Sequence, residues 1–148
     1  MPEIRIAENR DIGPCARLLG ILFGQEHEFT PDIRNQELGL DMIIGNPDNG
    51  TIFVCEKDGD IIGMVTLLTL VSTALGRKVL LLEDMIVDPA WRAKGVGSRL
   101  VEHACGWARD QGYGRITLLT DGDNDSAQHF YSGKGFSRSQ MAVFRKMI

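Results

Sequence analysis

A short basic segment with two glycines is the part of this sequence best suited to chemistry. Arg92 and Lys94 place positive charges beside Gly95 and Gly97, directly before a run that predicts an amphipathic helix, and Arg99 adds charge at the same end. Backbone N–H groups at a helix N-terminus bind anions, and glycine lets a phosphate approach the backbone closely. The segment therefore predicts a phosphate site. The alternative is that both glycines only serve a tight strand-to-helix turn.

Two other phosphate-binding motifs do not fit this segment. A dinucleotide-binding fingerprint needs a third glycine at the position that Leu100 occupies, and a P-loop needs a Gly-Lys-Ser/Thr sequence that is absent here. We therefore expect a phosphate-binding loop of another kind.

Two adjacent carboxylates, Glu83 and Asp84, interrupt an otherwise apolar run over residues 79–87. Such a run predicts a central strand that is covered on both faces. A carboxylate in a buried strand is unexpected unless it is paired or functional, so Glu83 is our candidate for a general base. Asp84 alternates to the other face and competes for this role. A Glu83 paired with an arginine, or placed at a water-filled opening of the sheet, is an equal alternative.

Other polar clusters favour structural roles. Residues 121–125 resemble a calcium loop, but Ser126 and Ser132 stand where that loop needs Gly and Glu, so we expect a polar loop that caps a helix at Ser126 and no metal. The three cysteines are widely separated and odd in number, which favours buried thiols over disulfides or a zinc site.

The hydrophobic pattern predicts strands and helices around these residues. Strands are expected over residues 4–6, 51–56, 61–68, 79–87, 116–120 and 141–147, and helices over residues 12–24, 31–44, 97–111 and 126–133. Asn9 or Asp11 is expected to cap the first helix, and a hairpin turn is expected at residues 57–60. This order predicts one α/β domain over residues 1–148, of the α+β type, with a mixed sheet and helices on both faces.

Composition and charge exclude several classes of protein. The 148 residues are 43% hydrophobic and 24% charged, as in soluble globular domains. A net charge of −4 argues against a nucleic-acid partner, because nucleic-acid binding requires a clustered basic face. The apolar runs are too short to span a membrane, and the N-terminus has no signal-peptide pattern. The expected location is cytoplasmic.

These motifs together resemble the GNAT family of N-acetyltransferases. Residues 92–97 match the family signature Gln/Arg-x-x-Gly-x-Gly/Ala, and residues 82–89 look like its core strand. Residues 124–136 resemble its second block, Asn-x-x-Ala-x-x-Phe-Tyr followed by Gly-Phe. The expected order of elements is also similar to the family fold. The resemblance covers nearly the whole chain and implies a GNAT-like mixed sheet with splayed central strands.

The resemblance implies acetyl-CoA as the acyl-donor cosubstrate, with its pantetheine arm in the gap between the splayed strands. The backbone of Met85, Ile86 and Val87 would bond the pantetheine and the acetyl carbonyl, and Asn124 would contact the arm from the opposite side. The residues that would hold the pyrophosphate are Arg92, Ala93, Lys94, Gly95, Val96, Gly97 and Ser98.

The implied reaction is direct attack by a neutral amine on the thioester carbonyl, without a covalent enzyme intermediate. Tyr131 would lie near the sulfur and donate a proton to the departing thiolate, and a backbone N–H would stabilise the oxyanion. Tyr131 has the alternative of packing beside Phe130. A non-catalytic acyl-CoA-binding or sensing module on the same fold is the alternative function.

The acceptor is expected to be an amine of a small molecule, peptide or protein. The segment Glu26-His27-Glu28 falls between the first two helices, where family members commonly shape the acceptor site. Our hypothesis is that Glu26 or Glu28 attracts a cationic acceptor, and the alternative is a solvated loop. Residues 71–78 are a second expected place for acceptor contacts. Small family members often pair, so a homodimer is also an expectation.

Overall fold

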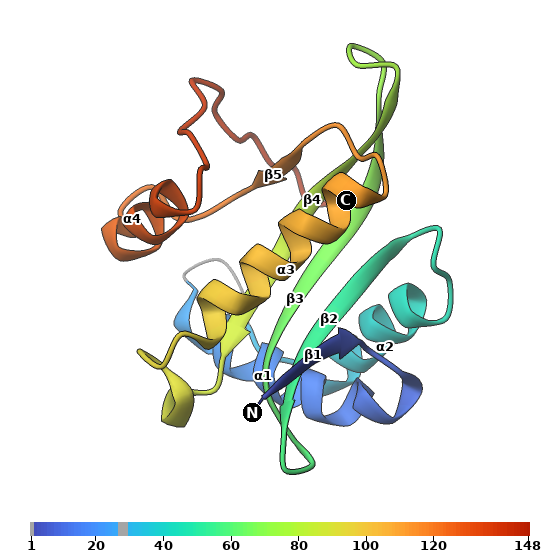
Figure 1. Cartoon of the computed structure of the whole chain (residues 1–148), viewed down its shortest axis with the longest axis vertical. Helices are drawn as coiled ribbons and strands as arrows, with labels where there is room; N and C mark the ends of the chain where they lie inside the picture. Colours follow the sequence, from blue (N-terminus) through green and yellow to red (C-terminus); the bar gives the residue numbers. More distant parts are fainter. Residues whose placement is uncertain (1, 27–29) are drawn as a thin grey trace.

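The computed structural model describes residues 2–26 and 30–148. These residues form a five-stranded sheet in the order β1-β2-β3-β4-β5 (Figure 1). The strands are β1 (Glu3–Ile6), β2 (Gly50–Lys57), β3 (Asp60–Ser72), β4 (Arg77–Val87) and β5 (Ile116–Leu118). The helices are α1 (Ile12–Gln25), α2 (Ile33–Ile44), α3 (Val96–Asp110) and α4 (Asp125–Gly133), with 3₁₀ turns η1 (Asn9–Asp11) and η2 (Pro89–Trp91). Strands β1 to β4 pair antiparallel, and β5 pairs parallel to β4.

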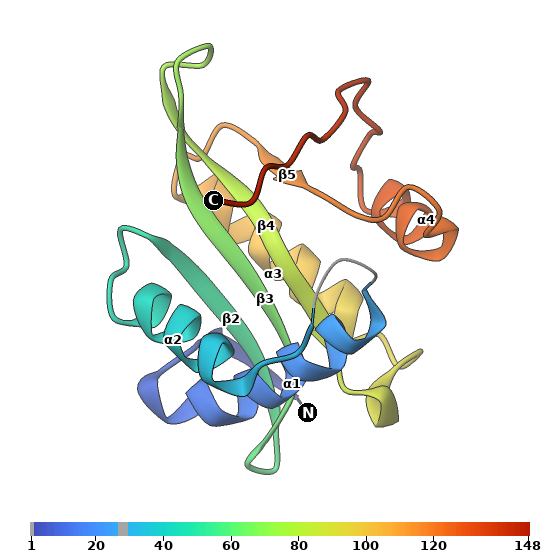
Figure 2. The ribbon, with the colours of Figure 1, turned by 180° about the vertical axis from the view of Figure 1, so that it is seen from behind.

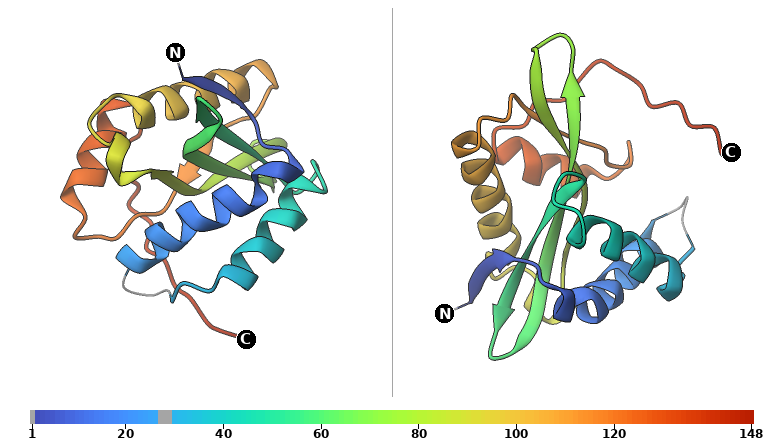
Figure 3. Two further views of the ribbon diagram at one scale, coloured as in Figure 1. Left: turned by 90° about the horizontal axis from the view of Figure 1, so that it is seen from below. Right: turned by 90° about the vertical axis from the view of Figure 1, so that its right-hand side faces the viewer.

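The sheet separates two layers of helices. Helix α3 covers one face, while α1 and α2 cover the lower part of the other face (Figures 2 and 3). Each layer has its own core of buried side chains. The α1–α2 side includes Leu18, Leu40, Val54 and Met64, and the α3 side includes Phe53, Val65, Leu67, Leu80 and Leu100. No helix among the described residues has the length and apolar character to cross a membrane.

Helix α3 packs close to the sheet because of its apolar stripe and one glycine beneath it. Its buried side chains recur at helical spacing and include Val96, Leu100, Ala104 and Ala108. Gly63 of β3 lies below the first turns, and a Cβ at this position would stand 3.0 Å from Leu100 Cδ1. The helix that carries the expected phosphate loop is therefore fixed against the centre of the sheet.

The fold class is confirmed, and most elements lie within a few residues of their expected bounds. The turn between β2 and β3 has positive φ at both Asp58 (51°) and Gly59 (85°), as the expected hairpin requires. The expected polar loop caps α4, because the side chain of its residue Asn124 accepts from Ala127 N–H. Asp11 is the N-cap residue of α1 as expected, but its carboxylate accepts from Arg5 and from Glu8 N–H and makes no hydrogen bond to the first turn of α1.

The expected closing strand over residues 141–147 is wrong, because this segment contains no strand. The chain leaves the domain after α4 and runs outward on the side of α1 and α2 (Figure 3, right). Met141 is 90% exposed and Phe144 is 97% exposed. A pattern of apolar residues makes a strand favourable, but the strand forms only where a neighbouring backbone can pair with it.

Candidate active site

Strands β4 and β5 diverge near the middle of the sheet. Their pairing begins at Leu80 with Ile116 and ends at Leu82 with Leu118, while β4 continues to Val87. Beyond Leu118 the chain leads to α4, away from β4 (Figure 1). From Glu83 onward, the edge of β4 that faces β5 thus has no strand partner among the described residues. The expected splay of the central strands is confirmed.

The backbone of β4 presents alternate residues to this open edge. Asp88 N–H donates to the carbonyl of Ile62 in β3, at 2.8 Å. Because residues along a strand alternate in the direction of their backbone groups, Ile86 also faces β3. Met85 and Val87 face the open edge. Of the three backbones expected to bond the pantetheine, these two have the appropriate direction.

The chain between β4 and α3 adopts left-handed backbone conformations at two positions. Ala93 has φ of 61° and Gly95 has φ of 83°. Gly95 is the N-cap of α3, and no side chain caps the helix. A left-handed residue before a helix turns successive N–H groups inward and forms an anion-binding concavity. Gly95 is favoured here because of its positive φ. The tight strand-to-helix turn and the expected phosphate site are therefore compatible hypotheses, since the same glycine serves both.

Free backbone donors gather in this turn. The first backbone hydrogen bond of α3 runs from Arg99 N–H to the carbonyl of Gly95, at 3.1 Å. The N–H groups of the first helical turn therefore have no backbone acceptor among the described residues. These donors belong to Val96, Gly97 and Ser98.

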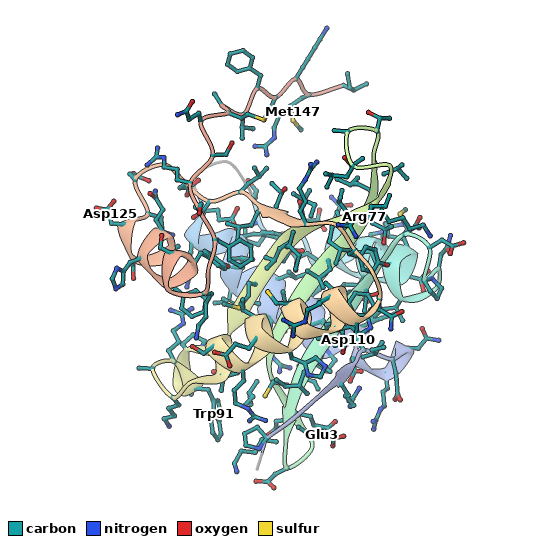
Figure 4. All side chains as sticks on the ribbon, turned by 45° about the horizontal axis from the view of Figure 1, so that its top comes forward. Glu3, Arg77, Trp91, Asp110, Asp125 and Met147 are labelled. Atoms are coloured by element: carbon teal, nitrogen blue, oxygen red, sulfur yellow. The ribbon has the colours of Figure 1, made fainter. Side chains whose placement is uncertain are left out.

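Cationic side chains surround the same turn. Arg92 Nε donates to the carbonyl of Val87 at 3.3 Å, and Lys94 Nζ lies 5.0 Å from the centre of the Trp91 ring. Lys57 Nζ, from the end of β2, lies 5.8 Å from the centre of the same ring. Trp91 stands at this end of the molecule (Figure 4). Nothing in the sequence signals that Lys57 joins the turn, since 35 positions separate it from Arg92 and the hairpin brings it there.

Arg99 takes a different role from the one expected. Its guanidinium donates to the carbonyl of Pro2 at 3.0 Å and ties α3 to the N-terminal segment. The positive charge of the turn thus comes from Arg92, Lys94 and Lys57.

Gly97 marks the place where α3, β4 and α4 meet. A Cβ on Gly97 would lie 3.2 Å from Met85 Cε and 3.7 Å from Phe130 Cζ. The glycine therefore allows α4 to reach the end of the open edge. This contact brings the two sequence blocks of the expected site together.

Helix α4 carries Tyr131, and Asn124 is its N-cap residue. The Asn124 carbonyl oxygen accepts from Ala127 N–H at 3.1 Å, so its amide nitrogen stays available to a ligand. Tyr131 packs edge-on against Phe130 and Phe136, with ring centres 5.1 and 5.7 Å away. Burial raises the pKa of Tyr131 to about 12, so the phenol stays protonated at neutral pH. The packing of Tyr131 beside Phe130, expected as the alternative, is confirmed. Proton donation by its hydroxyl to the departing thiolate stays a prediction.

A bulge in β4 decides where the two carboxylates point. Thr66 pairs with Asp84 and Leu67 pairs with Leu82, so Glu83 has no partner in the register. One extra residue reverses the alternation of a strand. Asp84 and Ile86 consequently face α1 and α2, whereas a regular strand would turn them toward α3. Glu83 is exposed, so its expected burial is wrong.

Asp84 lies at the floor of a cavity of about 230 Å³ between the sheet and the helices α1 and α2. The walls are largely apolar and include Leu19, Phe23, Leu40 and Ile43. Gln36 also lines the cavity, but its amide is engaged, because Nε2 donates to the Ala16 carbonyl at 2.7 Å and Oε1 accepts from Asp32 N–H at 2.8 Å.

The cavity changes the acidity of Asp84. Burial raises the pKa of this carboxyl to about 7, and the negative charge of neighbouring Glu83 adds to the rise. Thr66 opposes the shift only in part. The Thr66 hydroxyl is buried at the cavity floor and has no hydrogen-bond partner of good geometry among the described residues. An acid that titrates near neutral pH, beside an unused hydroxyl, can exchange a proton with a bound amine.

The remaining expectations have mixed outcomes. In the Glu26-His27-Glu28 segment, His27 and Glu28 lie outside the described residues, and Glu26 contributes to the raised pKa of Asp84. Cys15 and Cys55 are buried, and burial raises the pKa of the Cys15 thiol to about 12. Within residues 2–26 and 30–148, no group of three or more His, Cys, Asp or Glu side chains could hold a metal ion.

Comparisons with known proteins place this geometry in context. The model of the acetyltransferase (GNAT) family matches residues 17–136. The uncharacterized N-acetyltransferase YhfO of Bacillus subtilis is 30% identical over 137 residues, which cover 90% of this chain and 89% of that protein. N-acetyltransferase family 8 member 2 of Rattus norvegicus is 34% identical over 91 residues, 62% of this chain. The chain spans only 40% of the length of that relative.

Solved structures share the fold at lower identity. A possible acetyltransferase from Clostridium difficile 630 superposes with a TM-score of 0.91 at 16% identity, covering 100% of this chain and 98% of that one. The aminoglycoside N-acetyltransferase AAC(6')-Iy, in complex with CoA, superposes with a TM-score of 0.82 at 19% identity, covering 99% and 95%. At these identities the likeness shows the fold alone.

Proposed function

This chain belongs to the acetyltransferase (GNAT) family, and we propose that it is an enzyme that transfers an acetyl group from acetyl-CoA to a small-molecule or peptide amine. The observation that carries the proposal is the continuous path from the open edge of β4 into the uncapped N-terminus of α3. A strand edge with free amide groups suits the amide-rich pantetheine arm. The N–H groups at the start of α3, which have no backbone acceptor among the described residues, suit a pyrophosphate.

The residues along this path fit a coenzyme A thioester. Met85 offers its backbone groups at the open edge, and Val87 offers its N–H, since its carbonyl accepts from Arg92. The turn from Arg92 to Ser98 offers N–H donors and two cationic side chains. The CoA-bound neighbour of the same fold supports the choice of cosubstrate. When bound, acetyl-CoA would supply an acetyl group activated as a thioester.

The acceptor amine would enter from the cavity on the α1–α2 side of β4. An amine must lose a proton to become a nucleophile, and Asp84 at the cavity floor is the group that would take it. With a pKa of about 7, this carboxyl is ionised in a large fraction of molecules at neutral pH and is a stronger base than an ordinary aspartate. The Thr66 hydroxyl would accept a hydrogen bond from the amine and orient it. We therefore propose Asp84 as the base in place of Glu83, which is exposed.

Two groups would stabilise the charges that develop during transfer. A backbone N–H of Met85 or Val87 can donate to the acetyl carbonyl oxygen as negative charge grows on it. The protonated phenol of Tyr131 can donate a hydrogen bond to the departing sulfur. Its high pKa makes this stabilisation by hydrogen bonding more favourable than complete proton transfer.

The size and walls of the cavity bear on the acceptor. A volume of about 230 Å³ holds the amine-bearing end of a small molecule or a lysine-like side chain rather than a whole large substrate. The shared fold of an aminoglycoside N-acetyltransferase supports the proposal of a small-molecule amine as acceptor.

The direct test is turnover with acetyl-CoA and a panel of amines, with the acetylated product identified by mass and the free thiol measured in parallel. We expect equal amounts of thiol and acetylated amine for at least one amine with a compact head group. Coenzyme binding without any acetylated product would favour a sensing module, and the enzymatic proposal would then be abandoned.

A further inference from the structure

The cavity at Asp84 has different chemistry at its floor, its walls and its mouth. The helices α1 and α2, which cover this face of the sheet (Figure 2), supply the apolar walls Leu19, Phe23, Leu40 and Ile43. Asp84 and Thr66 supply the polar groups of the floor. Three further polar residues of the lining are exposed and therefore lie where the cavity opens to solvent, namely Thr30, Asp32 and Asn35.

The floor offers one carboxylate and one hydroxyl to a ligand. Thr66 and Asp84 are register partners on β3 and β4, so their side chains lie next to each other on one face of the sheet. Thr66 is 1% exposed, and its hydroxyl has no hydrogen-bond partner of good geometry among the described residues. A buried polar group without a partner costs free energy, so this hydroxyl favours a ligand that can bond to it. A single ammonium group, with three N–H donors, can bond to both side chains at once.

The walls offer no polar partner to the rest of the ligand. Gln36 also lines the cavity, but Nε2 of its amide donates to the Ala16 carbonyl at 2.7 Å and Oε1 accepts from Asp32 N–H at 2.8 Å. A ligand hydroxyl against these walls would lose its water without gaining a hydrogen bond, which weakens binding by about 10-fold or more. A ligand carboxylate would in addition be repelled by Asp84, and the described lining residues include no lysine, arginine or histidine to bind it.

The volume of the cavity limits the size of the hydrocarbon stem. With about 30 Å³ for each water-sized group, the volume of about 230 Å³ has room for roughly eight non-hydrogen atoms. A lysine side chain, a four-carbon stem with its nitrogen, would leave about a third of this volume empty. The wall atoms beside that void would lose their contacts. An aromatic ring on a short aliphatic stem, together with its amine, comes closer to filling the cavity.

We propose that the acceptor is a compact monoamine whose nitrogen is carried by an aliphatic or aromatic hydrocarbon, and that amino sugars, amino acids and lysine side chains bind less well. The walls and the volume select the hydrocarbon, while Asp84 and Thr66 select the single cation. This inference rests on the proposed function for the role of the cavity. Binding of an amine can nevertheless be measured without acetyl transfer, so the two proposals can fail separately.

Calorimetric titration of the full chain, without acetyl-CoA, tests the selection. The probes are phenethylamine, phenethyl alcohol, phenylalanine, glucosamine and Nα-acetyl-lysine amide. We expect the Kd of phenethylamine to be lower than that of each other probe by about 10-fold or more. Equal or tighter binding of any of the other four would overturn the inference, even if the protein acetylates glucosamine and the enzymatic proposal stands. Selective binding of phenethylamine without any acetylated product would uphold the inference and count against the enzymatic proposal.

A glycine of α2 allows the size of the cavity to be changed. Gly39 lines the cavity, and a Cβ on it would meet no heavy atom within 4 Å. Leucine is a better helix former than glycine, so Gly39→Leu should fold, which thermal unfolding checks. Because the new side chain takes up part of the cavity, phenethylamine binding should weaken by about 10-fold or more, and binding of the smaller butylamine should weaken much less.

The matched control is Gly106→Leu on α3, away from the cavity. A Cβ on Gly106 would stand 3.7 Å from Arg109 Nη2, an ordinary contact with a flexible side chain. This variant should bind both amines as the wild type does. Unchanged binding of phenethylamine by folded Gly39→Leu, or an equal loss for the two amines, would overturn the inference.

Discussion

At the scale of single residues, Asp84 connects the backbone of β4 to the chemistry of the site. The unpaired Glu83 shifts the register, and Asp84 thereby turns from the α3 side to the cavity beneath α1 and α2. Burial then brings its pKa to about 7, where a carboxyl can both accept and release a proton. One inserted residue thus determines position and acidity together.

This account predicts that Asp84→Asn lowers kcat/KM by about 100-fold or more, because general-base catalysis contributes 10² to 10⁴ in rate. In the wild type, kcat/KM should rise with pH through about 7 as Asp84 ionises, and this step should vanish in the variant. A pH profile of the acetylation rate measures both effects. The neighbouring Glu83→Gln is the control and should retain most of the activity, with the pH step still present but moved to lower pH, because the charge of Glu83 helps to raise the pKa of Asp84. Equal losses in both variants would refute the assignment.

The same carboxyl predicts an unusual dependence of stability on pH. Its pKa is higher in the folded protein than in the unfolded chain, so the folded state binds more protons between about pH 4 and 7. Stability from the neutral carboxyl is present at low pH and is lost as the pH rises through about 7. Asp84→Asn should therefore raise the melting temperature relative to wild type at pH 8 and have much less effect at pH 5. Thermal unfolding at the two values checks this, and a variant destabilised equally at both would contradict it.

The turn before α3 could be predicted from the sequence, because its signal is local. The glycines, the charged side chains and the start of the helix all lie within a few adjacent residues, so the sequence alone indicates the turn that contains Gly95 and Gly97. The exposure of Glu83 could not be predicted, because regular alternation does not reveal a bulge. The bulge arises from pairing with Thr66 and Leu67, which lie far away in the sequence.

At the scale of elements, Arg5 joins β1 to two other parts of the fold. Its guanidinium contacts Asp11 at 2.7 Å in η1 and Glu56 at 2.8 Å on β2. Asp11 is 3% exposed, and it also accepts from Glu8 N–H at 2.7 Å. Burial alone would raise the pKa of Asp11, but the bonds from Arg5 and Glu8 outweigh it and lower the pKa. This junction fixes the start of α1, which forms one wall of the cavity at Asp84.

We predict that Asp11→Ala destabilises the protein by about 3 kcal/mol at neutral pH, because it leaves a partly buried arginine without its main partner. Since the folded-state pKa of Asp11 is lowered, this stabilisation is present above the usual carboxyl pKa and is lost as the pH falls through the folded value. Urea unfolding at neutral and acidic pH measures the difference. Glu102→Ala removes a solvent-exposed pair with Lys134 and should cost less than about 1 kcal/mol. Similar losses for both variants would contradict the role of Arg5.

The elements themselves were predictable where one segment carries its own signal. The β2–β3 hairpin has an Asp-Gly turn between two apolar runs, and α3 has a clear apolar stripe. The closing strand over residues 141–147 was not predictable in this way, since a strand forms only if a second backbone lies beside it. Its apolar side chains indicate a strand, but they do not specify the second backbone that a strand needs.

At the scale of the whole molecule, the sheet separates two approaches to the end of β4. The open edge and the turn at Gly95 lie on the side of α3 and α4, while the cavity with Asp84 lies on the side of α1 and α2. A donor and an acceptor that enter from opposite sides can meet at β4 without competing for space. The C-terminal segment lies away from the turn at Gly95, as the positions of Met147 and of Trp91 beside that turn show (Figure 4).

The central claim is that the turn before α3 binds the pyrophosphate of coenzyme A, and calorimetric titration with acetyl-CoA tests it most directly. The double variant Arg92→Glu/Lys94→Glu reverses the two positive charges that lie within the turn itself. A matched control, Arg17→Glu/Arg109→Glu, makes the same change in net charge at exposed positions on α1 and α3. We predict micromolar binding by the wild type and the control, and a loss of at least 100-fold in the first variant. Absence of binding by the folded wild type, or equal binding by both variants, would contradict the account.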